Sequence, residues 1–176
     1  LSLTATTINY SDLIIGGNLT LTTNSGTLNK TMHAGGDINL NINAALITNA
    51  QLYANNNLNI NAHSWTNNHQ AATITGNITA DISGDITNNA LIYSTGNMQL
   101  NAANLTNNEE INSRGSLGLG HAARRISTVT NHAARIEAAS DINVYADVFN
   151  NNASGNAVIR IDDGGETVTE RYHDTR

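Results

Sequence analysis

Short segments in which apolar residues flank a middle position recur along the chain at a nearly constant spacing. Their first residues lie 18 to 20 positions apart, except for a last interval of 25. Repeats of about twenty residues that contain short alternating strands are typical of a solenoid, in which each coil packs on the next. The segments are Leu1–Leu3, Leu19–Leu21, Ile38–Leu40, Leu58–Ile60, Ile78–Ala80, Met98–Leu100, Leu117–Leu119 and Ile142–Val144.

Alternation within each segment predicts which side chains face the interior. Neighbouring side chains on a strand point to opposite sides, so the first and third positions form two inward columns and the middle position faces outward. One coil cannot bury these residues alone, but stacked coils can. We therefore predict an all-β protein, a parallel β-helix of about eight coils with repeats of 19 to 20 residues. A third inward column is expected on the return strand, at Met32, Leu52, Ala72, Ile92, Ile111 and Ile136.

The amino-acid composition favours β-strands over helices and excludes some classes of partner and site. Asn, Thr and Gly supply most polar positions and are poor helix formers. The absence of cysteine excludes disulfides, thiolate metal sites and cysteine nucleophiles. A net charge of −6 disfavours nucleic acid and anionic membranes as partners, and no apolar run is long enough for membrane insertion.

Two other repeat families of related period fit less well. Leucine-rich repeats need a fixed leucine pattern and usually a helical return, and the sequence has neither. Calcium-binding nonapeptide repeats need an iterated GGxGxD motif, which only Gly35–Asp37 and Gly164–Gly165 approach.

The repeat is clearest at residues 96–115, GNMQLNAANLTNNEEINSRG. Its pattern, Gly-x-(Ile/Leu/Met)-x-(Leu/Ile)-x-Ala followed by Leu-Thr-Asn and Ile-x-Ser-x-Gly, resembles the repeat of filamentous-hemagglutinin-type exoproteins of bacterial two-partner secretion. That family includes adhesins and the toxin-delivery stalks of contact-dependent growth inhibition. The resemblance covers residues 1–155. It implies a right-handed parallel β-helix, export through a dedicated outer-membrane transporter, and display at the bacterial cell surface.

The expected function follows from this resemblance. We expect an internal shaft segment of a large secreted or surface-displayed protein, which projects distal binding or toxin elements toward target cells and is not an enzyme. Residues 156–176 break the repeat and read as two strands around a Gly-rich turn. This hairpin is expected to cap the last coil or to begin a following module.

One asparagine in each coil follows a threonine where the coil is expected to turn. Asn tolerates left-handed backbone, and its amide can bond to the amide of the next coil to form a ladder. We expect a structural role for this column, which consists of Asn49, Asn67, Asn88, Asn107 and Asn131.

The long coil at 116–140 is the best candidate for direct binding. It holds about five extra residues between Gly120 and Val129, and insertions on solenoids often form the binding face. Only Glu137 opposes the basic residues of this region within 114–140. The alternative function is therefore recognition of an acidic glycan or a cell-surface receptor through Arg114, His121, Arg124, Arg125, His132 and Arg135.

Exposed tyrosines offer a second surface for contact. Tyr53 and Tyr93 fall in an outward column of the return strand, which reads His33, Tyr53, Thr73, Tyr93, Asn112 and Glu137. Aromatic side chains with a polar tip can stack on sugars or contact a protein. The two tyrosines lie two coils apart, which favours separate contacts over one platform.

Polysaccharide lyase or hydrolase activity is the weaker alternative. Glycoside hydrolysis needs two carboxylates within about 5 to 10 Å, and stacking aligns Asp81 with asparagines on the neighbouring coils. The histidine pairs His63/His69 and His121/His132 lack a third ligand, so no metal or other cofactor is expected. Trp65 aligns with Leu46 and Ile86, which favours a place in the core.

Overall fold

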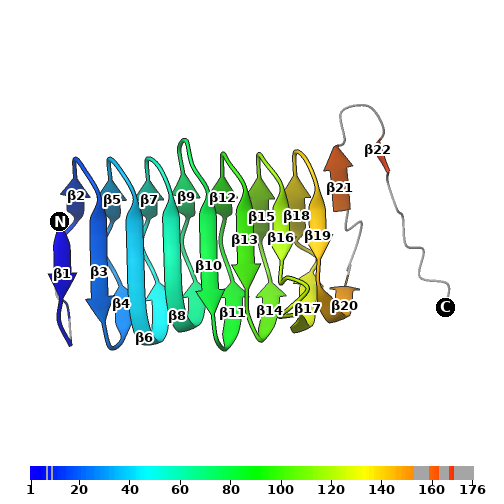
Figure 1. Ribbon diagram of the computed structural model, residues 1–176, viewed down its shortest axis with the longest axis horizontal. Helices are drawn as coiled ribbons and strands as arrows, with labels where there is room; N and C mark the ends of the chain where they lie inside the picture. The colour runs from blue at the N-terminus through cyan, green and yellow to red at the C-terminus, as the bar shows by residue number, and fades with distance from the viewer. Residues whose placement is uncertain (7, 9, 153–158, 163–166, 169–176) are drawn as a thin grey trace.

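The computed structural model describes residues 1–6, 8, 10–152, 159–162 and 167–168. All regular elements within these residues are β-strands, and coils of about twenty residues stack into a β-solenoid of about seven turns, against about eight predicted (Figure 1). The prediction of an all-β solenoid is thus confirmed.

The strands form two sheets that run the length of the stack. The larger sheet contains thirteen strands: β1 (Ser2–Thr4), β3 (Leu19–Thr23), β4 (Gly26–Leu28), β6 (Ile38–Thr48), β8 (Leu58–Asn67), β10 (Ile78–Ile82), β11 (Asp85–Asn88), β13 (Met98–Asn101), β14 (Asn104–Asn107), β16 (Leu117–Leu119), β17 (Ile126–His132), β19 (Ile142–Val144) and β20 (Ala146–Asn152). The return sheet contains nine strands: β2 (Leu13–Ile15), β5 (Met32–Ala34), β7 (Leu52–Ala54), β9 (Ala71–Thr73), β12 (Ile92–Ser94), β15 (Glu110–Ser113), β18 (Arg135–Ala138), β21 (Ile159–Asp162) and β22 (Thr167–Val168).

Equivalent strands of successive coils pair in parallel, so backbone hydrogen bonds run along the stack. Ile38 is in register with Leu58, Leu58 with Ile78, and Ile78 with Met98, as the alternation predicted. Among the named strands, only β21 and β22 pair antiparallel. Of the hairpin expected at 156–176, the structure describes only the paired strands β21 and β22, and the rest of the segment falls outside the described residues.

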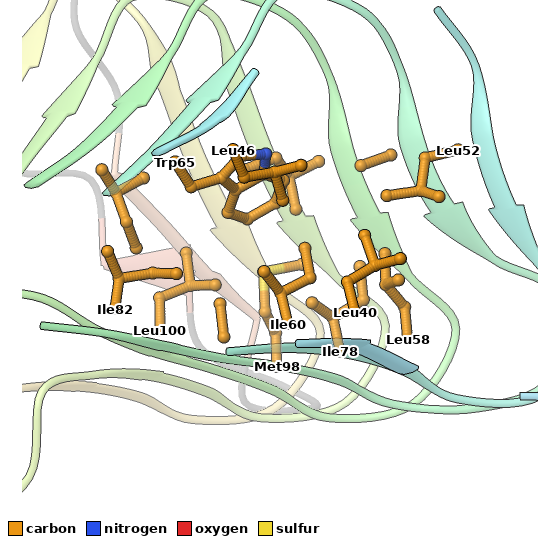
Figure 2. Packing of buried hydrophobic residues seen from close by; sticks show 14 of the residues in the cluster. Leu40, Leu46, Leu52, Leu58, Ile60, Trp65, Ile78, Ile82, Met98 and Leu100 are labelled. Atoms are coloured by element: carbon orange, nitrogen blue, oxygen red, sulfur yellow. The ribbon is translucent and has the colours of Figure 1, made fainter. Parts of the chain in front are cut away.

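The first two inward columns are buried as predicted from Leu19 to Leu119, whereas Leu1 and Val144 at the two ends are 53% and 39% exposed. Leu58, Ile78 and Leu117 are completely buried, and so are Ala80 and Leu100 in the adjacent column. Figure 2 shows two rows of side chains that face each other across this interior, with Leu40, Ile60 and Leu100 in one row and Trp65, Leu46 and Leu52 in the other. The core is therefore continuous from coil to coil.

The third inward column needs one correction. Ala71, and not Ala72, is in register with Leu52 on one side and Ile92 on the other. The cause is the bend between the two halves of the coil, where the pairing of β6 with β8 shifts register between Ile42 and Ala45. The coil that begins at Leu58 has one residue fewer at this bend than the coil before it, and a slip of one residue moves a side chain to the opposite face.

The extra residues of the long coil form a tight turn between β16 and β17. His121 and Arg124 exchange backbone hydrogen bonds of 3.1 and 2.9 Å. Gly120 opens the turn with a φ of +71°, a left-handed conformation that L side chains rarely adopt. A Cβ at this position would also lie 2.6 Å from the Tyr145 carbonyl oxygen.

Candidate functional site

A buried ladder of side-chain amides runs along the turn of the coils. Each Nδ2 donates to Oδ1 on the next coil, over distances of 2.8 to 2.9 Å. The ladder consists of Asn67, Asn88, Asn107, Asn131 and Asn151. Four of these amides also donate to a backbone carbonyl, for example from Asn107 to Glu109 at 2.9 Å. Buried amides are thereby satisfied, which avoids the cost of unpaired polar groups in the core.

The predicted place of Asn49 in this ladder is wrong. Thr48 is in register with Asn67, and its hydroxyl donates to Asn67 Oδ1 at 2.9 Å while it accepts the Trp65 indole N–H at 3.2 Å. The Thr-Asn pair of this coil, Thr48–Asn49, is shifted by one residue relative to the Thr-Asn pairs of the later coils, so Thr48 takes the place of the asparagine. Asn49 therefore faces outward.

Asn49 belongs to a second, exposed ladder that sequence reasoning missed. Its Nδ2 donates to Asn29 Oδ1, and the amides of the following coils continue the series at 2.7 to 2.9 Å. The members are Asn29, Asn49, Asn68, Asn89 and Asn108. The sequence signal for this second ladder is the Asn-Asn pair that recurs at 67–68, 88–89 and 107–108.

A third ladder joins side-chain oxygens to backbone amides before each strand of the larger sheet. The Oδ1 atom on one coil accepts the backbone N–H of the equivalent residue on the next, at 2.8 to 3.0 Å. The acceptors are Asn18, Asp37, Asn57, Asn77 and Asn97. Glycine precedes four of them, and at Gly36, Gly76 and Gly96 a Cβ would collide with an Oδ1 atom of the ladder; at Gly96 it would lie 2.3 Å from Asn77 Oδ1. Gly17, the fourth, has open space at this position.

The predicted basic patch is not assembled. Arg124 forms a salt bridge with Asp81 and Arg125 forms one with Asp147, each between partly exposed side chains. Arg135 contacts both Glu110 and Glu137, at 3.3 and 3.1 Å. The expectation that these three arginines are nearly unopposed is therefore wrong. Asp81, Asp147 and Glu110 lie on other coils, and Glu137 lies on the same strand as Arg135.

The remaining basic residues are spread out. Arg114 lies in the turn that precedes β16, whereas His121 and Arg124 lie in the turn that follows it, at the opposite end of that strand (Figure 1). His132 is exposed at the end of β17. Neutralised and separated cations give this region little excess positive charge with which to attract a sulfated glycan.

Tyr53 and Tyr93 flank one residue of the return sheet. Ala72 is in register with both of them, and it is only 1% exposed although it faces outward. Thr73, which was expected in this outward column, is buried instead. The Tyr53 ring also meets the His33 ring edge to face at 5.4 Å. Both tyrosines are half-buried, which indicates a packed surface stripe.

Two carboxylates do share partners on neighbouring coils. Glu110 and Glu137 both accept hydrogen bonds from the Asn112 amide and both contact Arg135. Sequence reasoning missed this pair because the two residues occupy different register positions. Both carboxylates act as acceptors in an ion-pair network, which is an ordinary structural arrangement for an exposed strand.

The structure has no evident metal site in the part of the chain that it describes. No group of three His, Asp or Glu side chains among those residues could hold a metal ion. His63 instead contacts Ser83 at 2.9 Å through Nδ1. Trp65 is completely buried, as expected.

One titratable group near the first coils is strongly perturbed. Burial raises the pKa of the Tyr10 hydroxyl to about 12. The same hydroxyl donates a 3.0 Å hydrogen bond to the Lys30 carbonyl. The charge of Asp12 adds to the increase. The contact anchors the start of the stack to the next coil.

Two hollows open on the outer face of the larger sheet. The first, of about 400 Å³, lies over β13 and β16 beside the turn at 120–124, and its lining includes Gln99, Gly118, His121, Asn143 and Tyr145. The second, of about 300 Å³, lies over β6, β8 and β10 on the other side of that turn and includes the Asp81–Arg124 pair. Sequence reasoning missed both hollows, because each combines residues from several coils with the inserted turn.

In comparisons with known proteins, no protein-family model matches this chain, and neither a curated protein nor a solved structure matches it. The described residues include no helix that is long and apolar enough to cross a membrane.

Proposed function

We propose that this chain is a rigid shaft segment of a large secreted exoprotein of the filamentous-hemagglutinin type, which projects distal binding or toxin elements from the bacterial surface. The proposal gives the chain a mechanical role and assigns no catalytic residue. Export would use an outer-membrane transporter of the two-partner kind, as the repeat pattern implies.

The observation that supports a shaft most directly is the continuous parallel pairing of successive coils. Each coil is tied to the next by parallel backbone pairing and by hydrogen bonds of the three side-chain ladders. Coils of a solenoid contact only their neighbours, so the stack lengthens by one strand spacing, about 4.8 Å, with each added coil. A chain of this kind can fold from one end as it emerges from a pore.

The test is a duplication in register. Residues 38–97 make up three coils, because Ile38 and Met98 occupy equivalent positions through the pairings of β6, β8, β10 and β13. A second copy of 38–97 inserted after Asn97 should lengthen the rod by about 14 Å in small-angle X-ray scattering, with the melting temperature retained. The matched control duplicates 38–96 only, which shifts the faces by one residue and should destabilise the protein.

The same duplication in a parent exoprotein tests the function. Secretion and the activity of the distal element should persist in the lengthened protein. The shaft role would be refuted if the isolated 176-residue chain accounted for the cell attachment of the parent protein.

A further inference from the structure

The first hollow has a floor and walls suited to a ligand. Its floor is the outward column of β10, β13, β16 and β19, in which Thr79, Gln99, Gly118 and Asn143 are in register. The turn that begins at Gly120 closes one side through His121. We call this feature the Gln99 hollow, defined by Gln99, Gly118, His121, Asn143 and Tyr145.

The Gln99 amide is fixed in one orientation. Its Nε2 donates to Asn101 Oδ1 at 2.8 Å and to the Gly120 carbonyl at 2.7 Å, which uses both amide hydrogens. Oε1 accepts no hydrogen bond from the described residues. A preoriented acceptor at the rim of a hollow is ready for a hydroxyl or N–H donor of a ligand.

The absence of a side chain at Gly118 allows the Gln99 amide to take this orientation. The Gln99 side chain lies over Gly118, and a Cβ at position 118 would stand 2.1 Å from Oε1 and 2.8 Å from the amide carbon. Any other residue would therefore displace Gln99 from its present position. The absence of a side chain at 118 thus has a local consequence for the hollow, separate from the packing of the core.

The described walls of the hollow present an aromatic ring and no carboxylate, lysine or arginine side chain. Tyr145 is 36% exposed, and Asn143 supplies an exposed amide with two donors and an acceptor. The lining contains no Asp, Glu, Lys or Arg, and His121 is its only basic side chain. Amides that bond to hydroxyls beside an exposed aromatic ring are suited to a pyranose, which presents hydroxyl groups around its edge and C–H groups on its faces.

We infer that the Gln99 hollow binds an uncharged sugar unit of a glycan chain, with Gln99 and Asn143 bonded to its hydroxyls and Tyr145 against its face. The hollow is open along the sheet, so the rest of an oligosaccharide can extend over the outer face of the solenoid. This site differs from the arginine turn, whose cations are paired with carboxylates, and it goes beyond the shaft role.

The experiment presents the purified 176-residue chain to immobilised neutral and sulfated oligosaccharides and measures the strongest neutral binder by titration calorimetry. We expect saturable binding to at least one neutral oligosaccharide. Gln99→Ala and Tyr145→Ala should each weaken it about tenfold, the effect of losing about 1.4 kcal/mol of contact. Gly118→Ala should weaken it as well by displacing Gln99.

Matched variants separate the site from general effects. Gly17→Ala adds a methyl group that meets nothing within 4 Å, and Tyr53→Ala removes a tyrosine from the other sheet, so both should bind as the unmodified chain does. The double variant Arg124→Ser/Arg125→Ser should also retain neutral-glycan binding. Melting curves of every variant show whether it is folded.

Three outcomes would overturn the inference. They are the absence of saturable binding to any neutral glycan, binding that survives in the folded Gln99 and Tyr145 variants, and binding confined to sulfated glycans that is lost in the double arginine variant. The last outcome would assign recognition to the turn. None of them bears on the in-register duplication, which tests the shaft separately.

Discussion

Asn67 Nδ2 donates a 2.8 Å hydrogen bond to Oδ1 of Asn88 on the next coil, and both side chains are completely buried. The buried ladder continues in this direction toward the C-terminus. In the exposed ladder the amides donate the opposite way, as from Asn89 to Asn68 at 2.8 Å. The dipoles of the two adjacent ladders therefore oppose each other, which limits the build-up of charge at the ends of the stack.

The buried ladder predicts a large effect of Asn88→Ala. The change leaves the Asn67 amide without its acceptor and Asn107 Oδ1 without its donor, in a dry environment. We expect a loss of about 2 to 4 kcal/mol in the free energy of unfolding, measured by urea denaturation. The control is Asn89→Ala in the exposed ladder, where water replaces the lost partners and the cost should stay below about 1 kcal/mol. Equal costs for the two variants would contradict this account.

The second prediction concerns how Trp65 and Ala71 share the core volume of one coil. The coil that contains the indole has Ala62 and Ala71 where its neighbours have larger residues, such as Leu52 and Ile92 beside Ala71. Ala71→Ile should therefore overpack the core and cost about 1 to 3 kcal/mol in denaturant unfolding.

The same change should cost less in a Trp65→Leu background, because the smaller side chain leaves room for it. The double-mutant cycle measures this coupling, which we expect to reach at least about 0.5 kcal/mol. Additive costs would show that the two residues do not share the same space.

The third ladder predicts that Gly96 cannot be replaced without cost. The Cβ of Gly96→Ala would stand 2.3 Å from Asn77 Oδ1, which already accepts the Asn97 N–H at 2.8 Å. The oxygen cannot move away without loss of that bond, so we expect destabilisation of about 1 to 3 kcal/mol in thermal or denaturant unfolding. Gly17→Ala serves as the control, and a neutral result for Gly96→Ala would show that the ladder readily adjusts.

Tyr10 predicts a loss of stability in strong alkali. Its pKa rises from 10.0 in the unfolded chain to about 12 in the fold, so the folded state holds the phenolic proton more tightly. The associated stability is complete below pH 10 and is lost as the pH rises toward 12. Ultraviolet difference absorbance should show a tyrosine component that ionises near pH 12, and Tyr10→Phe should remove that component. Ionisation of all tyrosines in a single early step would contradict the assignment.

Sequence periodicity was sufficient to predict the solenoid and its first two core columns. Apolar residues such as Ile38, Leu58 and Ile78 recur at a constant interval on short strands and alternate there with polar neighbours. Which face of the strand each side chain occupies therefore depends only on nearby residues. Ala72 was misplaced because a fixed interval was assumed across bends of unequal length, and Asn49 because the Thr-Asn pairs of successive coils were assumed to be in register. In both cases an error of one residue exchanged the inner and outer faces.

The chain by itself thus determined that strands alternate, that coils repeat about every twenty residues and that aliphatic side chains meet inside, because these features depend on neighbouring residues. Tertiary structure alone decided which carboxylates neutralise the arginines and how Gln99 comes to lie over Gly118 beside Tyr145. The physical reason is that such contacts join coils whose relative register depends on the length of every bend and turn between them.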